Sequence, residues 1–333
     1  MSRLAIITGI TSQDGSYLAQ LLLQKGYRVH GLCRDMEKSR ARLASFLGFP
    51  VDKITLQETD ITDANQMGEL IRSLRPDEVY NLAAQSSPAR SVQNPRETVL
   101  VNAICPLNIM EAIREAALAG TTRFFQASSA EIFTDRAGAP QNEQTPLGPR
   151  NPYGASKALA HCLVGSYRAS HGLFASSGIL YNHESDRRGK QFVTMKIRDA
   201  VAEALAGGPC PVTLGNLSAR RDWGWAPDYV HGMWLALQAK SPEDFVFATG
   251  TAHTVRDFVE AMFRRMGNVT LRWEGRGVEE KGYDTSTGKM MVAVNQEFFR
   301  PAEECVMVGD CSKALQTLGW RHTVSFDELI GLM

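Results

Sequence analysis

The sequence predicts an α/β fold: a doubly wound, parallel, Rossmann-type sheet with a smaller, interleaved C-terminal lobe that binds substrate. Strand-sized apolar runs alternate with helical patterns through the first half of the chain, and a glycine-containing turn follows the first run. After Tyr181 the alternation becomes irregular and richer in loops. A chain of 333 residues with 44% hydrophobic content can bury a core of this size.

Six apolar runs in the first half are predicted to be strands. They are LAIIT (4–8), YRVHGLC (27–33), KITLQE (53–58), DEVYNLA (77–83), TRFFQAS (122–128) and FASSGILY (174–181). Their spacing leaves room for helical crossovers, which is typical of parallel sheets.

Helices are predicted from apolar residues at helical spacing. The first follows Gly15, carries Leu18, Leu21 and Leu22 on one face, and stops at Gly26. The second has Met67, Leu70, Ile71 and Leu74 on one face and ends before Pro76. Further helices are expected over residues 153–171, 192–206, 228–239 and 254–266.

The chain divides into a dinucleotide-binding domain over residues 1–181, with returning segments near 222–250 and 303–312, and a substrate lobe over most of 182–333. In doubly wound folds the ligand crevice lies at the carboxyl ends of the strands. We therefore expect the loops after the first, fourth, fifth and sixth strands to meet at one site.

Composition excludes several classes of partner. The 36 basic and 36 acidic residues cancel, so no global field favours nucleic acid or an anionic membrane. No apolar stretch approaches the ~18 residues of a membrane span, and a cytoplasmic location is expected. The six cysteines show no metal-binding or disulfide spacing, so we expect no metal and mostly reduced core thiols.

The turn GITSQDG, residues 9–15, has the context of a phosphate-binding loop, because it follows a strand and opens a helix. A plain tight turn is the alternative. Gly9 and Gly15 occupy glycine positions of the pattern, but Ser12 stands at the middle one. If Ser12 needed a positive φ, the cost would be about 1 kcal/mol, which weakens binding without abolishing it.

The end of the second predicted strand favours NADP over NAD. NAD-binding proteins usually place an acid there, whereas this chain has Cys33 followed by Arg34, with Lys38 and Arg40 nearby. Asp35 opposes a 2′-phosphate, and a solvated surface charge run is the alternative. Asp60, after the third strand, could contact the adenine.

NPYGASKAL places Tyr153 and Lys157 four residues apart on one face of a helix. A nearby ammonium lowers the pKa of a tyrosine, which would make Tyr153 a general base for a sugar hydroxyl. QASSAEIF ends the fifth strand upstream and would project Ser128, Ser129 and Glu131 into the same crevice. The alternatives are an exposed helical pair and a structural glutamate.

The chain resembles the extended short-chain dehydrogenase/reductases and, within them, the GDP-mannose 4,6-dehydratase family. The resemblance runs nearly end to end and includes VYNLAAQS, FFQASSAEIF, PYGASK, NHESDRRGKQFVTMKI, LGNLSARRDWGWAPDYV and FFRPAE. NHES followed by RRG, and RRDWG, are far more specific than the glycine loop or the YxxxK pair.

The resemblance implies roles for matching residues. Tyr153 would act as the base at the 4-hydroxyl, Lys157 would tune it, Glu131 would take the C5 proton, and Ser129 would orient the 4-oxygen. The implied cofactor contacts are Gly9, Ile10, Thr11, Ser12, Gln13, Asp14, Gly15, Arg34, Asp60, Ile61, Leu82, Ala83, Ala84, Gln85, Ser86, Tyr153, Lys157, His183 and Arg188. The implied substrate contacts are Ser86, Asn182, Lys196, Arg221, Arg300 and Glu303.

The implied reaction converts GDP-mannose to GDP-4-keto-6-deoxymannose. A C4 ketone acidifies the C5 hydrogen, a carboxylate removes that proton, and water leaves from C6. The alternatives are a related GDP-sugar such as a GDP-heptose, a nucleotide-sugar 4-reductase or epimerase, and a non-catalytic NADP-binding protein. Glu131 distinguishes a dehydratase from a 4-reductase or epimerase, because a simple dehydrogenase needs no such carboxylate.

Some positions depart from the family pattern. Ser12 replaces glycine, Ser129 replaces threonine, EIFT replaces ELYG, and Glu97 falls where the family tends to present a tyrosine. The segment RDMEKSRARLASFLGFP, residues 34–50, also differs from a family loop that helps to build a tetramer. A homo-oligomer is expected, either dimer or tetramer.

Overall fold

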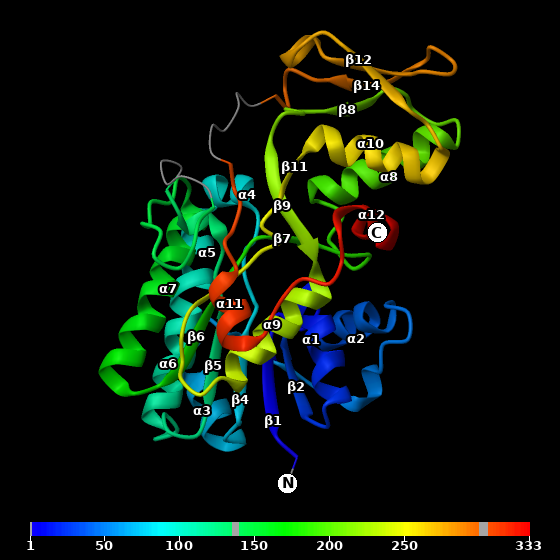
Figure 1. Cartoon of the computed structure of the whole chain (residues 1–333). Helices are drawn as coiled ribbons and strands as arrows, with labels where there is room; N and C mark the ends of the chain where they lie inside the picture. Colours follow the sequence, from blue (N-terminus) through cyan, green and yellow to red (C-terminus); the bar gives the residue numbers. More distant parts are fainter. Residues whose placement is uncertain (1, 135–139, 300–305) are drawn as a thin grey trace.

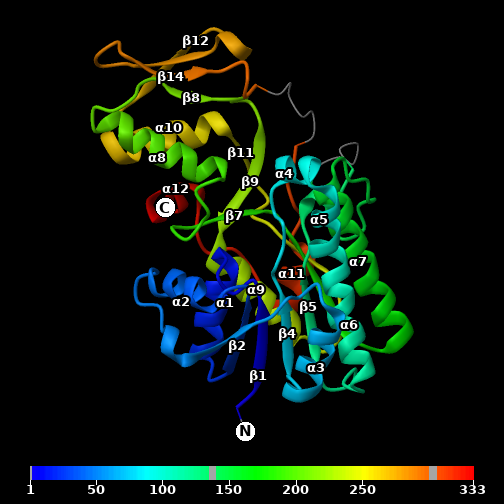
Figure 2. The same ribbon diagram turned by 180° about the vertical axis from the view of Figure 1, so that it is seen from behind.

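The computed structural model describes residues 2–134, 140–299 and 306–333. The chain forms a larger lobe around a seven-stranded sheet and a smaller lobe beyond the carboxyl ends of its strands (Figures 1 and 2). The predicted α/β fold class is confirmed.

The seven-stranded sheet is parallel throughout and has the order β10-β6-β5-β4-β1-β2-β3. Its strands are β1 (Leu4–Thr8), β2 (Arg28–Cys33), β3 (Ile54–Glu58), β4 (Glu78–Asn81), β5 (Arg123–Ala127), β6 (Phe174–Leu180) and β10 (Phe245–Phe247). The first six coincide with the predicted strands within two residues at each end. The strand order reverses beside β1, so the ends of β1 and β4 border the crevice expected at such a switch point.

Successive side chains of β1 enter different core clusters, because strand side chains alternate between the faces of a sheet. Ile7 packs with Leu18 and Met233, whereas Ile6 packs with Ile71 and Ile113. Helices α1 and α9 therefore cover one face, and α3 and α6 cover the other.

Most helices of the larger lobe connect strands of the sheet, and α11 follows the last strand of the chain. The helices are α1 (Gln13–Gln24), α2 (Met36–Ala44), α3 (Ala64–Leu74), α4 (Pro88–Gln93), α5 (Pro95–Val99), α6 (Cys105–Glu115), α7 (Pro152–His171), α9 (Ala226–Gln238) and α11 (Ser312–Leu318). A π-helical turn over Leu100–Ile104 joins α5 to α6. Short 3-10 turns lie at Val51–Lys53 and Ala130–Ile132.

The predicted start of the first helix was wrong by three residues. Helix α1 begins at Gln13, because Ser12 caps it and Gly15 already lies in its first turn. The helices predicted over 153–171 and 228–239 are confirmed as α7 and α9.

The described part of the smaller lobe contains two short sheets and three helices. The first sheet holds β7 (Asn182–Glu184), β9 (Arg220–Trp225) and β11 (Ala252–Thr254). The second holds β8 (Val212–Leu214), β12 (Leu271–Glu274), β13 (Lys281–Asp284) and β14 (Met290–Val294). The helices are α8 (Val193–Leu205), α10 (Val255–Gly267) and α12 (Phe326–Leu332), and a 3-10 turn spans Gly277–Glu279. The predicted helices over 192–206 and 254–266 are thus confirmed.

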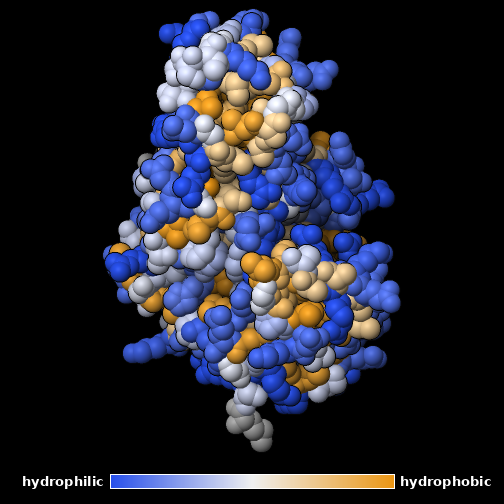
Figure 3. Space-filling model, turned by 90° about the vertical axis from the view of Figure 1, so that its right-hand side faces the viewer, coloured by the Kyte–Doolittle hydropathy of each residue, from blue (hydrophilic) through white to orange (hydrophobic). Residues whose placement is uncertain are grey.

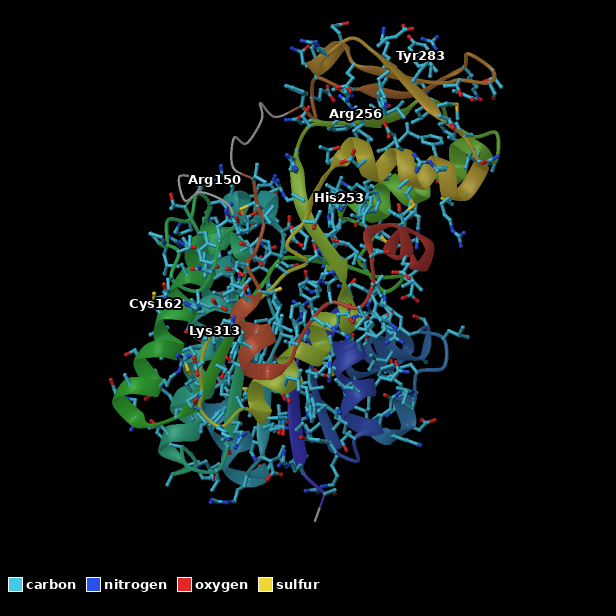
Figure 4. All side chains as sticks on the ribbon, in the orientation of Figure 1. Arg150, Cys162, His253, Arg256, Tyr283 and Lys313 are labelled. Carbon is cyan, nitrogen blue, oxygen red and sulfur yellow. The ribbon has the colours of Figure 1, made fainter. Side chains whose placement is uncertain are left out.

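The expectation that most cysteines are core thiols was wrong. Cys33 and Cys105 are buried, Cys210 and Cys311 are half-buried, and Cys162 is exposed on α7 (Figure 4). All five are free thiols, and Cys305 lies outside the described residues. No helix in the described part is both long and apolar enough to cross a membrane.

Candidate active site

The phosphate loop is tight because its two glycines face backbone. Gly9 has φ +67°, and a Cβ there would lie 2.8 Å from the Ala83 nitrogen. A Cβ on Gly15 would lie 2.3 Å from the Gly9 carbonyl oxygen. The loop therefore keeps a close approach of backbone segments at the start of α1, which is the cradle that a dinucleotide pyrophosphate needs.

Ser12 does not damage this loop. Its φ is −73°, so the strain of a positive φ does not arise. Its side-chain oxygen accepts a hydrogen bond from the Gly15 N–H at 3.0 Å, which makes Ser12 the N-cap of α1. The departure from glycine adds a helix cap.

We expect Gly9→Ala to abolish cofactor binding, because the new methyl group meets the backbone of Ala83. Gly26→Ala is a matched control, since Gly26 has φ +80° but open space around it. The control should cost about 1–2 kcal/mol of stability through strain alone and still bind cofactor. Isothermal titration calorimetry measures both variants, and equal binding by both would show that the close approach is not required.

Thr8 fixes the second wall of the predicted cofactor site. Its hydroxyl oxygen accepts hydrogen bonds from the N–H groups of Leu82 (3.1 Å) and Ala83 (3.0 Å). The same hydroxyl donates a hydrogen bond to the side-chain oxygen of Asn81. Buried Gln85 is held by Asn102, whose amide group bonds both the N–H and the C=O of Gln85. Sequence reasoning missed Thr8 and Asn102, although a polar residue at the end of an apolar strand was a usable signal.

The charges after β2 are arranged to favour an anion at Arg34. Asp35 caps α2 and pairs with Lys38 at 2.7 Å, so its charge is compensated locally. Arg40 pairs with Asp52, whereas exposed Arg34 forms no ion pair with any residue that the structure describes. The Asp60 carboxylate stays within its own loop, where it accepts hydrogen bonds from the N–H and the hydroxyl of Thr62. These bonds, and more weakly the charge of Arg34, lower the pKa of Asp60.

Other predicted cofactor positions lie along the same edge. Ile10 is buried, Thr11 accepts from Arg42 through its carbonyl oxygen at 3.0 Å, and Ser86 is exposed after β4. Ala84 and Ile61 are partly exposed on the loops after β4 and β3.

The predicted catalytic residues come from two elements that meet at the end of β5. Ser129 caps the 3-10 turn after β5 by accepting from the N–H of Glu131. Asn151 caps α7, and its side-chain amide donates to a carboxylate oxygen of Glu131 at 3.2 Å. A Cβ on Gly154 would lie 2.4 Å from the Glu131 carbonyl oxygen, so the start of α7 packs directly on the Glu131 backbone. Asn151, which sequence reasoning missed, joins the two elements.

Lys157 is almost fully buried, with 3% of its surface exposed, and its ammonium donates to the Ala127 carbonyl oxygen at 2.8 Å. Its nitrogen lies 6.0 Å from the centre of the Tyr153 ring. The two side chains share one face of α7, as predicted.

The predicted effect of Lys157 on Tyr153 was wrong for the protein without ligand. Burial raises the pKa of Tyr153 to about 12, and the charge of Glu131 adds to that rise, whereas a hydrogen bond with Ser129 opposes it. Burial lowers the pKa of Lys157 to about 8. Desolvation is the largest cause of both shifts, and Lys157 is not among the causes of the shift at Tyr153.

The loop after β7 fastens the smaller lobe to helix α1. Ser185 donates to the Gln13 side chain, Asp186 accepts from Tyr17 at 2.6 Å, and Arg187 donates to Gln20. The Arg187 guanidinium lies 3.9 Å from the centre of the Tyr17 ring, with Phe46 and Phe49 also close. The divergent segment 34–50 therefore packs against its own chain.

Two more predicted cofactor residues, His183 and Arg188, lie in this region. His183 contacts Asp14 at 2.9 Å. Arg188 contacts Glu184 at 3.1 Å and lies over the ring of Phe192. Glu97, another departure, pairs with Arg90 through both carboxylate oxygens at 3.0 Å.

Three of the predicted substrate residues, Asn182, Lys196 and Arg221, lie on the smaller lobe. Asn182 is exposed at the start of β7 and pairs in register with Trp223 of β9. Arg221 is half-buried on β9, and Lys196 is exposed on α8. Arg300 and Glu303 lie outside the described residues.

Buried Asp222, which sequence reasoning missed, fixes the strand that carries Arg221. It accepts hydrogen bonds from the N–H groups of Thr249, Gly250 and Gly309.

A cavity of about 520 Å³ lies elsewhere in this lobe, lined partly by Trp223, His253 and Phe326, and contains none of the predicted site residues (Figure 4).

The fold and the clustered serine, tyrosine and lysine define an extended short-chain dehydrogenase/reductase. A model of the family described as GDP-mannose 4,6 dehydratase matches residues 6–333. The chain belongs to the GDP-mannose 4,6-dehydratase family.

Curated relatives agree with this assignment, and solved structures share the fold. GDP-mannose 4,6-dehydratase of Sinorhizobium fredii is 44% identical over 331 residues, covering 98% of this chain and 94% of the relative. The Homo sapiens enzyme is also 44% identical, over 98% and 89% of the two chains. The structure of Thermotoga maritima UDP-glucose 4-epimerase with UDP-glucose aligns with a TM-score of 0.79 at 21% identity, covering 99% and 96% of the chains. The structure titled RMD from Pseudomonas aeruginosa, complexed with NADPH, aligns with a TM-score of 0.77 at 18% identity, covering 99% of this chain and 97% of the other.

Proposed function

We propose that this enzyme is a hydro-lyase that converts GDP-mannose to GDP-4-keto-6-deoxymannose. The observation that carries the proposal is the placement of Glu131: Asn151 holds its carboxylate at the start of the helix that carries Tyr153 and Lys157. Proton removal from C5 needs a carboxylate beside the group that acts at the C4 oxygen. The family and its 44% identical relatives support the same reaction.

The residues divide the reaction among them. Tyr153 takes the proton of the 4-hydroxyl, with Ser129 orienting the oxygen, and Lys157 holds the nicotinamide ribose. Glu131 takes the C5 proton that the C4 ketone has acidified, and water leaves from C6. A nicotinamide cofactor held by the glycine loop and Lys157 would supply the redox chemistry, as the acceptor of hydride from C4 and its donor to C6. The glycine cradle and the capped N-terminus of α1 fit its pyrophosphate.

Arg34 supports NADP as the cofactor, because it is a cation without an ion-pair partner in the described chain. We expect Arg34→Ala to raise the Kd for NADP by about 10- to 100-fold, the loss of one charge-assisted hydrogen bond, and to leave the Kd for NAD unchanged. Arg72→Ala, which removes an exposed cation on α3, is the matched control. Equal weakening of NAD and NADP by Arg34→Ala would contradict the assignment.

For the nucleotide sugar, Lys196 and Arg221 supply positive charge from two elements of the smaller lobe and would neutralise the diphosphate. Asn182 and Ser86 would contact the sugar. Arg300 and Glu303 belong to the same proposal through their match to the family. GDP-mannose is favoured over a GDP-heptose because the Sinorhizobium fredii and Homo sapiens relatives are named GDP-mannose 4,6-dehydratases.

The direct test is incubation of the purified protein with GDP-mannose and catalytic NADP, without reductant, followed by mass spectrometry. The expected product is lighter by one water. A product of unchanged mass would favour an epimerase, a demand for stoichiometric reductant would favour a 4-reductase, and no product from any GDP-sugar would leave a non-catalytic protein.

We also propose a homo-oligomer formed through α5, the π-helical turn and α7. Val99, Leu100 and Leu159 are exposed along these neighbouring elements, with 37%, 41% and 43% of their surfaces accessible. The opposite side of the molecule shows only separate apolar patches among polar residues (Figure 3). Dimer and tetramer would be separated by sedimentation. The cytoplasmic location stays a prediction from the sequence.

A further inference from the structure

The backbone of Glu131 is fixed by contacts on both sides. Its N–H donates to the Ser129 hydroxyl oxygen at 3.2 Å, and a Cβ on Gly154 would lie 2.4 Å from its carbonyl oxygen. Immediately after it, the Ile132 carbonyl oxygen accepts a hydrogen bond from the N–H of Gly148 at 3.0 Å. Only the side-chain torsions of Glu131 are then left to decide where its carboxylate lies.

The side chain of Asn151 restricts those torsions. Its Oδ1 atom accepts from the Gly154 N–H at 2.8 Å, as the N-cap of α7, and its Nδ2 atom donates to the Oε2 atom of Glu131 at 3.2 Å. Because a backbone N–H only donates, the atom that faces Gly154 must be the oxygen of the amide. The NH₂ group therefore faces Glu131, so the helix cap makes Asn151 a donor toward the carboxylate.

The two oxygens of the Glu131 carboxylate differ in their contacts. Oε2 is held by Asn151, whereas Oε1 forms no hydrogen bond with any residue that the structure describes. A hydrogen bond to an ionised carboxylate is roughly twice as strong as one between neutral groups, so the contact to Oε2 is able to orient the group. Glu131 is half-buried, and its second oxygen is left to take a proton.

We propose that Asn151 is a positioning residue for the removal of the C5 proton: its amide holds one carboxylate oxygen of Glu131 so that the other faces the substrate. This inference rests on the proposed function of Glu131. In that step the C5–H bond breaks and its proton passes to Oε1. The electron pair forms the C5–C6 double bond, and the C6 hydroxyl leaves with that proton as water.

Two substitutions at Asn151 separate this role from the capping of α7. Serine and aspartate are both good N-cap residues, so Asn151→Ser and Asn151→Asp should keep the helix start. The serine hydroxyl lies one atom closer to the backbone than the amide nitrogen, so it cannot reach both partners. Aspartate has the shape of asparagine but presents only acceptor oxygens to the carboxylate. Both variants therefore lose the donor and keep the cap.

The first test is steady-state kinetics of the full chain with NADP and GDP-mannose. We expect both variants to unfold at a temperature close to that of the wild type and to bind NADP with unchanged Kd. The KM for GDP-mannose should also stay unchanged. The value of kcat should fall by about 10- to 100-fold, the loss of one charge-assisted hydrogen bond.

The absorbance of reduced nicotinamide during turnover separates positioning from a merely structural role. If only the C5 step is slower, the C4 hydride has already been transferred, and a larger share of the cofactor is reduced at steady state. A structural defect would inactivate part of the molecules and leave that share unchanged. We therefore expect the reduced share to rise in both variants.

Crystal structures of the wild type and Asn151→Ser without substrate test the same contact independently of turnover. The Glu131 carboxylate should keep one position in the wild type and be displaced, or take more than one position, in the variant. If the wild type does not turn over GDP-mannose, the proposed function fails, and these structures still decide whether Asn151 holds the carboxylate.

Thr254→Ser is the matched control, because it also places serine at an N-cap, that of α10 in the smaller lobe. It should leave kcat and the reduced share unchanged. An unchanged kcat in both Asn151 variants, a lower kcat without a larger reduced share, or an unmoved carboxylate in Asn151→Ser would overturn the proposal.

Discussion

Glu131→Gln is expected to lower kcat by about 10²- to 10⁴-fold, the usual contribution of a positioned acid or base, while NADP affinity stays unchanged. Glutamine keeps an oxygen that can accept from Asn151, so the contact between the 3-10 turn and α7 survives. What is lost is the ability to take the C5 proton. Steady-state kinetics on GDP-mannose, with calorimetry for NADP, would measure both effects.

Glu115→Gln provides the matched control, because Glu115 is an exposed glutamate at the end of α6 whose ion pair with Arg114 spans 3.5 Å. It should leave kcat unchanged. If Glu131→Gln also kept its rate within a few-fold, the carboxylate would have no proton to remove, and a reductase or epimerase activity would explain the site better.

Tyr153→Phe should lower kcat by a similar factor, because it removes the only phenolic oxygen that we assign to the 4-hydroxyl. The bond of Lys157 to the Ala127 carbonyl oxygen does not involve that hydroxyl, so folding and NADP binding should persist. Tyr283→Phe is the control. Tyr283 lies on β13 in the small sheet at the far end of the smaller lobe (Figure 4).

The pH dependence of the wild type shows whether Tyr153 is the group that takes the 4-hydroxyl proton. With the pKa of Tyr153 near 12 before ligand binds, activity should rise with pH until Lys157, with a pKa near 8, loses its proton. A variant that retained this profile and most of its rate would show that another group takes the 4-hydroxyl proton.

The fold was predictable because most strands of its large sheet are buried on both faces and read as apolar runs, although β3 at the edge is largely exposed. All five residues of β1 are buried, and such a run between turn signals has few alternatives. Helices α4 to α6 were missed, although Ile109, Met110 and Ile113 of α6 are fully buried. Three prolines and a π-helical turn interrupt that segment and obscure its period.

The candidate site was predictable where a pair of residue types at a fixed spacing indicates a specific chemical role. Tyr153 and Lys157, four residues apart on one helix, are such a pair. It was not predictable where partners come from distant segments. Asn151 and Glu131 are twenty residues apart, and Asp14 and His183 are 169 apart. The sign of the pKa change on Tyr153 also failed, because a pairwise argument from sequence does not include the depth at which the fold places both groups.

The central claim is that one sugar loses hydrogen from C4, loses water across C5 and C6, and regains that same hydrogen at C6. GDP-mannose labelled with deuterium at C4 tests it directly, with NMR and mass spectrometry of the product. We expect the deuterium at C6 of a 4-keto-6-deoxy sugar, within the molecule that began with it. Deuterium lost to solvent, or still at C4, would contradict the account.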